Sequence, residues 1–170
     1  KQRQMKPIDP FDAALNTSPV QVDDDLEASN ARFASLFQNM PLGVIYQEAD
    51  GRISLANPAA EQILGLSLMQ MQGRMSQDPR WRAIREDGSP FPGDEHPSMV
   101  ALRTGKPVTD VVMGVYHPDK QEIRWIRVAA APEFRPGETT PFRVFATFDD
   151  ITARRNAEQA LAESERRFRL

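Results

Sequence analysis

Cysteine is missing from the 170 residues, which excludes disulfides, thiolate metal sites and cysteine nucleophiles. No segment reaches the roughly 20 apolar residues that a transmembrane helix needs, and the first residues lack the apolar core of a signal peptide. With a formal net charge of −3 and scattered basic residues, nucleic-acid binding has no electrostatic basis. We therefore expect a cytoplasmic protein with no membrane contact in these residues, while a membrane anchor elsewhere in a longer protein stays open.

The residue patterns of enzymes and metal sites are also missing. Two separated histidines and scattered carboxylates do not supply the three or four clustered ligands of a metal site. The sequence contains no Gly-rich loop with lysine, no Gly-x-Ser-x-Gly and no His-Glu-x-x-His. We expect no catalysis by this stretch. Because it starts with Lys1 and not with Met, we also expect it to be part of a longer protein.

What is present is an ordinary globular composition, 40% hydrophobic and 26% charged, with room for one domain and its flanking segments. Residues 1–22 combine several prolines with polar residues and predict a linker or weakly ordered arm. Residues 23–40 predict an entry helix, because Asp23–Asp25 supply a cap and an acidic first turn. Its apolar residues follow at helical spacing: Leu26, Phe33, Leu36, Phe37 and Met40.

Residues 41–150 predict a domain of strands interrupted by short helices. An Asp50-Gly51 turn joins two short strands, and Asn57-Pro58 begins a helix that Gly65 ends. Residues 66–94 are irregular, apart from a short helix from Asp78 through Ile84. The remaining predicted elements are strands at 43–48, 52–56, 108–116, 122–131 and 142–148 and a helix at 95–103. Strands separated by a block of helices indicate an α+β fold with a mostly antiparallel sheet.

Residues 151–170 predict a charged, alanine-rich helix that continues directly from the last strand. Asp150 or Thr152 can cap it, with Ile151 as a hydrophobic staple. A short pattern of the entry helix recurs in this helix: Leu26, Ser29, Arg32 and Phe33 return as Leu161, Ser164, Arg167 and Phe168. Chance is one explanation; the one we favour is that a second, similar domain begins here.

The terminal helices also suggest how the protein assembles. Both place Leu and Phe seven residues apart, which is the spacing of a coiled-coil seam. We therefore expect a homodimer through these helices, and a solvent-facing linker helix is the alternative.

The order of these elements resembles the PAS domain family over about residues 30–152. The resemblance is carried by Asn57–Gly65 after a hairpin, by Trp125 in the fourth strand and by Asp150-Ile151-Thr152 after the last one. The segments 86–90 and 102–105 are also similar to the family. It implies a five-stranded antiparallel sheet of strand order 2-1-5-4-3, with short helices on one face and a cleft between them.

The resemblance further implies a sensory and dimerisation module of a bacterial signalling protein. Domains of this kind lie upstream of histidine kinase, diguanylate cyclase or phosphodiesterase domains, so a two-component system is one expected context. The flavin photochemistry of some relatives needs a reactive cysteine and is excluded here. Haem would need an axial ligand such as His96, but its place beside Pro97 at a helix start favours a capping or surface role. The sequence identifies no cofactor.

A small-molecule pocket is a further expectation. Candidate walls are Tyr46, Trp81, Phe91, Met99, Leu102, Met113 and Trp125, and candidate anchors for a carboxylate are Arg85, Arg103 and Arg127. The same aromatic and methionine residues also suit an ordinary core. Two hypotheses follow. In the first, a ligand or partner shifts the sheet and the signal passes through Asp150-Ile151-Thr152 to a downstream domain. In the second, the domain is a ligand-free dimerisation spacer.

Overall fold

The computed structural model describes residues 19–74, 76 and 78–169. Residues 1–18 of the predicted arm lie outside this part of the chain. The described residues divide into two compact units after Phe37. Helix α1 spans Pro19–Asn39, so the prediction of an arm up to residue 22 is wrong for residues 19–22. Proline is well tolerated at a first helical position, where its missing N–H would have no partner, and it does not delay the helix to Asp23.

The second unit contains five strands and several short helices. The strands are β1 (Gly43–Glu48), β2 (Ile53–Ala56), β3 (Val108–His117), β4 (Glu122–Glu133) and β5 (Arg143–Asp150). The helices are α2 (Pro58–Leu64), α3 (Leu68–Met71), α4 (Pro97–Thr104) and α5 (Thr152–Phe168), with 3-10 turns η1 (Pro79–Trp81) and η2 (Gly93–Glu95).

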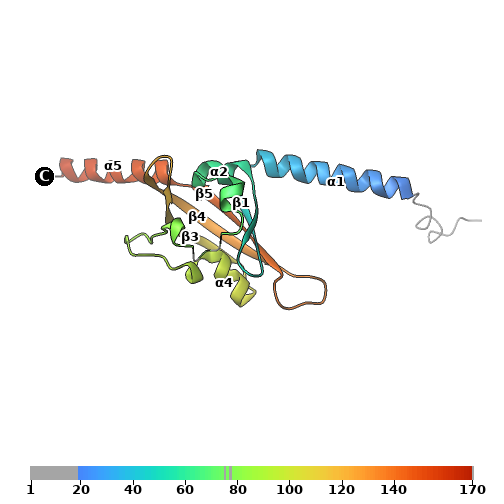
Figure 1. Ribbon diagram of the computed structural model, residues 1–170. Coiled ribbons are helices and arrows are strands. Elements are labelled where there is room, and N and C mark those ends of the chain that lie inside the picture. The colour runs from blue at the N-terminus through green and yellow to red at the C-terminus, as the bar shows by residue number, and fades with distance from the viewer. Residues whose placement is uncertain (1–18, 75, 77, 170) are drawn as a thin grey trace, which may run out of the picture. The chain divides into compact units, whose positions relative to one another are not determined.

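All the strand pairs are antiparallel, and the sheet has the order β2-β1-β5-β4-β3 (Figure 1). The predicted fold class and strand order are thus confirmed. The central strand β5 pairs with β1 on one side and with β4 on the other, and it runs directly into α5. Both β1 and β4 are therefore hydrogen-bonded to the strand that precedes α5.

One face of the sheet carries the core. Alternate residues of a strand point to opposite faces, and α2 and α4 pack against the strands on one of these faces. The buried cluster joins Val144 and Ala146 of β5 with Ala60 of α2 and Ala101 of α4. Small residues at these helix positions allow the helices to approach the sheet closely.

Asn57 fixes the start of α2, as predicted. Its Oδ1 accepts the N–H of Ala60 at 3.0 Å and also that of Val44 at 2.8 Å, while Nδ2 donates to the Leu42 carbonyl at 2.9 Å. The side chain is fully buried. One residue therefore both caps the helix and binds it to the first strand.

The segment between the hairpin and α4 is where the structure departs most from the predictions. The capping box of Ser67 and Gln70 starts a helical turn, α3, that was not predicted. The helix predicted through Ile84 is the single turn η1, because Arg82 adopts a left-handed conformation with φ of 45°. Ile84 instead forms bridges with Gly114 and Pro90 at the sheet edge. Helix α4 begins at Pro97 and not at Glu95, which belongs to η2.

His117 joins the end of β3 to α2. Its Nε2–H donates to the Gln62 carbonyl at 3.2 Å, and its Nδ1 accepts the Lys120 N–H at 3.2 Å. A neutral imidazole with the proton on Nε2 satisfies both bonds, because the carbonyl can only accept and the amide can only donate. A Cβ on Gly65, the residue after α2, would lie 2.4 Å from Cε1 of this ring. The ring therefore needs glycine at position 65.

We predict that Gly65→Ala lowers the free energy of unfolding more than Gly137→Ala, as measured by urea denaturation. Both glycines have positive φ, 68° and 79°, but a Cβ at Gly137 meets nothing within 4 Å. Gly137→Ala therefore costs only the conformational term, roughly 1–2 kcal/mol. Gly65→Ala adds about 1–3 kcal/mol of overpacking against His117. Equal losses for the two variants would contradict this packing.

Candidate functional site

A small cavity lies between the sheet and the helices of the second unit. All five strands contribute to its wall, and Pro97 and Ser98 at the start of α4 close part of it. Its volume is about 80 Å³. The lining residues are Ile45, Gln47, Ile53, Leu64, Ser76, Trp81, Ala83, His96, Pro97, Ser98, Met113, Val115, Ile126, Val128, Ala146 and Phe148. None of them is Asp, Glu, Lys or Arg.

Two of the predicted ligand residues line this cavity: Trp81 and Met113. Phe91 lines a neighbouring groove, which shares Trp81 and His96 with the cavity wall. Leu102 packs against the edge of the core, and Met99 is half-buried nearby in α4 without lining the cavity.

The other predicted ligand residues lie elsewhere. Tyr46 and Trp125 alternate with the cavity residues of their strands and therefore face the opposite side of the sheet. Tyr46 lies 6.0 Å from the Phe145 ring. The predicted arginine anchors do not reach the cavity, because each has another partner: Arg85 pairs with Glu95, Arg103 donates to the Asp94 carbonyl, and Arg127 pairs with Asp110.

The expected capping or surface role of His96 is wrong for its side chain. His96 occupies the position before α4 but makes no side-chain cap bond. Its Nε2–H instead donates to the Phe91 carbonyl at 3.0 Å. Burial lowers the pKa of His96, partly opposed by this bond and by Asp94. A haem does not fit, because Nε2 is engaged and 80 Å³ is far below the roughly 300 Å³ or more of typical ligand sites.

Sequence reasoning missed Gln47 as a cavity residue. It is 2% exposed and lies on β1 in phase with Ile45. Its Nε2 donates to the Gly51 carbonyl at 2.8 Å and to Ser76 Oγ at 3.3 Å. The alternation of β1 was the available signal: it places a polar residue on the face that otherwise carries apolar side chains.

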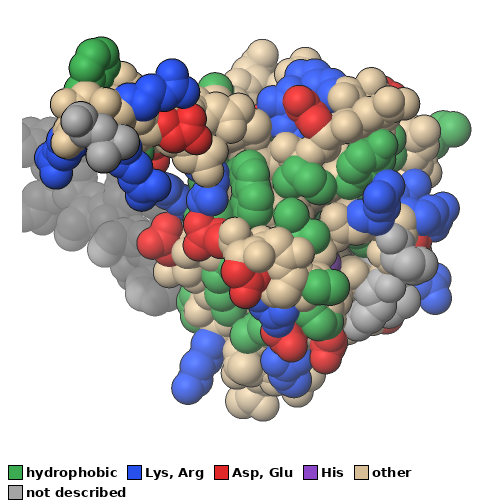
Figure 2. Space-filling view, turned by 90° about the vertical axis from the view of Figure 1, so that its left-hand side faces the viewer, with side chains coloured by type: hydrophobic (Ala, Val, Ile, Leu, Met, Phe, Trp, Pro, Cys, Tyr) green, Lys and Arg blue, Asp and Glu red, His purple; other side chains and the backbone are tan. Residues whose placement is uncertain are grey.

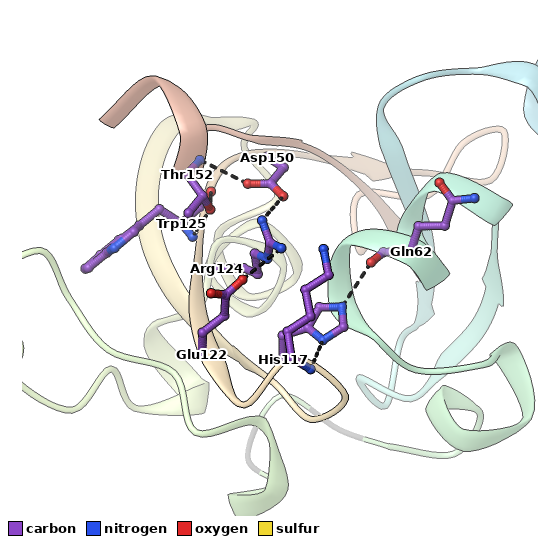
Figure 3. Close-up of polar contacts among 8 residues, drawn as sticks. Gln62, His117, Glu122, Arg124, Trp125, Asp150 and Thr152 are labelled. Carbon is purple, nitrogen blue, oxygen red and sulfur yellow. Dashed lines mark hydrogen bonds and ion pairs between the residues drawn. The ribbon is translucent and has the colours of Figure 1, made fainter. Parts of the chain in front are cut away.

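The junction between β5 and α5 is bound to β4 by backbone and side-chain bonds (Figure 3). Thr152 Oγ accepts the Trp125 N–H at 2.9 Å, and the Ile151 N–H donates to the Trp125 carbonyl at 2.9 Å. Asp150 Oδ1 accepts the Thr152 N–H at 3.0 Å, which confirms the predicted cap for Asp150. Thr152 does not cap the helix, because its hydroxyl faces β4.

Charged side chains extend the same junction. Arg124 lies between two carboxylates, 3.5 Å from Asp150 and 2.8 Å from Glu122. Because Asp150 also accepts the first amide of α5, this arginine holds the capping carboxylate against β4. Its side chain is 17% exposed, which makes the contact stronger than an open surface pair. Arg124 and Trp125 are thus the residues of β4 that bind the junction residues Asp150, Ile151 and Thr152.

Arg155 makes a second connection from α5. Its guanidinium lies 4.5 Å from the centre of the Trp125 ring and 2.6 Å from the Glu86 carboxylate. Glu86 follows Ile84, which is bridged to Gly114 of β3, and Ala83, which lines the cavity. The first turn of α5 therefore contacts both β4 and the segment that forms part of the cavity wall.

Figure 2 shows that Lys and Arg, Asp and Glu, and hydrophobic side chains all occur on one face of the molecule. Among the described residues, no three His, Cys, Asp or Glu side chains come together as a metal site. No helix within residues 19–74 or 78–169 is long and apolar enough to cross a membrane.

The fold and the sequence both relate the chain to PAS domains. The family model described as PAS domain matches residues 31–96. The PAS domain of an HTR-like protein from Haloarcula marismortui is 18% identical, with a TM-score of 0.58 over 78% of this chain and 99% of that chain. The PAS domain of a protein from Colwellia psychrerythraea is 20% identical, with a TM-score of 0.55 over 72% of this chain and 97% of that chain.

A third similar structure is a sensory box histidine kinase/response regulator from Burkholderia thailandensis. It is 18% identical, with a TM-score of 0.52 over 81% of this chain and 98% of that chain. No curated protein matches the sequence. The five-stranded sheet of order β2-β1-β5-β4-β3 with α2 and α4 on one face defines a PAS fold. Residues 31–96 thus match the PAS family model, and the chain has the fold of PAS domains.

We predict that Thr152→Val lowers the free energy of unfolding by about 1–3 kcal/mol, because valine keeps the shape but leaves the Trp125 N–H without its acceptor. Amide exchange at Trp125, measured by NMR, should become faster. Thr109→Val is the matched control, since Thr109 is an exposed residue of β3, and it should stay within about 0.5 kcal/mol of the parent. Unchanged exchange at Trp125 would contradict the assigned bond.

Proposed function

We propose that this chain is a sensory and relay module of a bacterial signal-transduction protein. A small ligand or a partner acts on the PAS domain, and the change passes through Asp150-Ile151-Thr152 into α5 and on to a downstream domain. A histidine kinase or a diguanylate cyclase is the kind of output domain we expect there. The resemblance to the sensory box histidine kinase from Burkholderia thailandensis supports the signalling context.

One observation carries this proposal: consecutive residues of β4 serve the cavity and the junction. Arg124 and Trp125 bind the junction, and Ile126 lines the cavity. Neighbouring residues of a strand move together. A displacement of Ile126 in the cavity wall would therefore also displace the amide of Trp125, which binds Thr152. Coupling needs such an element with two arrangements of similar energy, and the short polar junction is where those arrangements would differ.

The contacts of Arg155 with Glu86 and Trp125 also support transfer of a signal from the cavity to α5. Glu86 belongs to the segment that leaves the cavity wall at Ala83, and it pairs directly with α5. We propose that the ion pair and the contact with Trp125 set the angle at which α5 leaves the domain. Since Arg155 Nε is buried without a hydrogen bond among the described residues, this arrangement stores a polar cost of about 1–3 kcal/mol that a second arrangement could relieve.

We predict that Thr152→Val and Asp150→Asn uncouple input from output in the full-length protein. Each removes one bond between the junction and β4 and leaves the core intact. The measurement is output activity with and without stimulus, together with circular dichroism to show that the variants fold. Thr109→Val serves as the control and should respond like the parent. Normal signalling by both junction variants would show that the signal takes another route.

The second candidate function, a ligand-free dimerisation spacer, is favoured by the exposed apolar residues of the terminal helices. Leu26, Phe33 and Leu36 of α1 are 58%, 52% and 67% exposed, and Leu161 and Phe168 of α5 are 62% and 87% exposed. We propose that each terminal helix pairs, through a seam of these residues, with the same helix of a second copy, in a parallel homodimer. In the sensor the same seam would transmit the change; in the spacer it would be the whole function.

We predict that Phe33→Glu dissociates the dimer in sedimentation equilibrium, because it places a charge in the seam. Ala34→Glu is the matched control: Ala34 is exposed one residue away, outside the seven-residue spacing, and this variant should stay dimeric. A dimer that survives Phe33→Glu would refute the proposed seam. Native mass spectrometry of the purified dimer then separates the two functions, since a retained small molecule supports the sensor and an empty dimer supports the spacer.

A further inference from the structure

Gln47 places an unused hydrogen-bond acceptor in the cavity wall. Its amide orientation is fixed by its partners, because the Gly51 carbonyl can only accept and so must face the NH₂ group. The second N–H goes to Ser76 Oγ. Oε1 accepts no hydrogen bond among the described residues, and it is not one of the side-chain atoms that are sealed off without a partner. Because Gln47 lines the cavity, this oxygen is open to a hydrogen-bond donor placed there.

Ser98 adds a second free polar group on the opposite wall. It is 6% exposed, lies at the start of α4 and lines the same cavity. Its hydroxyl likewise has no hydrogen bond within the described residues. A hydroxyl can both donate and accept. The cavity of about 80 Å³ thus has a hydrogen-bond acceptor on the sheet, Gln47 Oε1, and a hydroxyl that can donate or accept on α4, that of Ser98.

The rest of the wall selects against charge. It contains no Asp, Glu, Lys or Arg, and the pKa of His96 is lowered by burial, which favours its neutral form. A carboxylate or an ammonium group in this space would lose its hydration without gaining an opposite charge. The arginines that the sequence offered as anchors have other partners, so they do not change this balance.

We propose that the cavity binds a compact, uncharged molecule that donates a hydrogen bond to Gln47 Oε1 and packs an apolar body against the sheet. Gln47 is then the residue that sets ligand specificity. This inference rests on the sensory function proposed above and specifies the chemistry of its input. The groove lined by Phe91 shares part of the wall with the cavity, which gives a larger ligand room to extend toward solvent.

The experiment compares pyrrole with furan, two five-membered rings of matched size of which only pyrrole has an N–H donor. Binding is measured by NMR titration of the ¹⁵N-labelled chain. We expect pyrrole to bind at least about fivefold more tightly than furan, the difference that one net hydrogen bond supplies. Pyrrole-2-carboxylate, the charged analogue, should bind more weakly than pyrrole. Equal affinity for pyrrole and furan, or tighter binding of the carboxylate, would overturn the proposal.

Variants assign the effect to Gln47 and to the cavity. Gln47→Met should reduce pyrrole affinity to the level of furan and leave furan unchanged. Because this variant also loses the bonds to Gly51 and Ser76, Ala146→Val is a second test: it fills the cavity from β5 and should abolish binding of both probes. Ala129→Val, on the opposite face of β4, is its control and should bind normally. Pyrrole binding that survives Ala146→Val would place the site elsewhere and overturn the proposal.

The two proposals fail separately. If neither ring binds while the Thr152 and Asp150 variants still uncouple signalling, the ligand class is wrong and the relay stands. If pyrrole is preferred through Gln47 while those variants signal normally, the ligand class stands and the relay is wrong.

Discussion

The hydrogen bonds between Trp125 and the pair Ile151 and Thr152 bind the start of α5 to the middle of the sheet. They hold the first residues after β5 against β4. Asp150 adds the helix cap and, through Arg124, an ion pair to β4. These bonds join polar groups that are partly buried, so breaking one leaves a group unpaired at a cost of about 1–3 kcal/mol. The cost of one such bond stays below the roughly 5–15 kcal/mol by which a domain is stable, so the proposed relay can change this contact without unfolding the domain.

Strand β4 contributes to both the cavity and the junction, and the proposed relay rests on this shared strand. Strand alternation sends Ile126 into the cavity and Trp125 to the opposite face, where Arg155 of α5 lies on its ring. The cavity is uncharged and small, whereas the junction is charged and lies nearer to solvent. We propose that a neutral molecule acts on the sheet by packing, and that the sheet acts on α5 through these hydrogen bonds.

Turn residues, caps and strand-forming residues were enough to predict most of the strands and helix starts, because each of these signals is local: Asp50-Gly51 for the first hairpin, Asn57 for α2 and Asp150 for α5. The strand order was not available from these signals and was implied by the resemblance to PAS domains. The residues that line the cavity were harder to predict. Whether a residue lines it depends on the face of the strand that it occupies, and whether an arginine reaches it depends on which carboxylate or carbonyl that arginine binds. Tyr46 and Trp125 look like ligand residues by type, yet they lie on the opposite face. Gln47 looks like a surface residue by type, yet it is 2% exposed. The structure of residues 66–94 was predicted least well. Part of this segment is fixed by a contact distant in sequence, the bridge between Ile84 and Gly114 at the sheet edge.

The most direct test of coupling between cavity and helix is amide hydrogen exchange at Trp125, Ile151 and Thr152 in the Ala146→Val variant. This substitution changes the cavity wall on β5 and touches none of the junction bonds. Our account predicts altered exchange at these three amides, with Ala129→Val leaving them as in the parent. Identical exchange in the parent and in Ala146→Val would contradict the claim that the cavity and α5 are coupled.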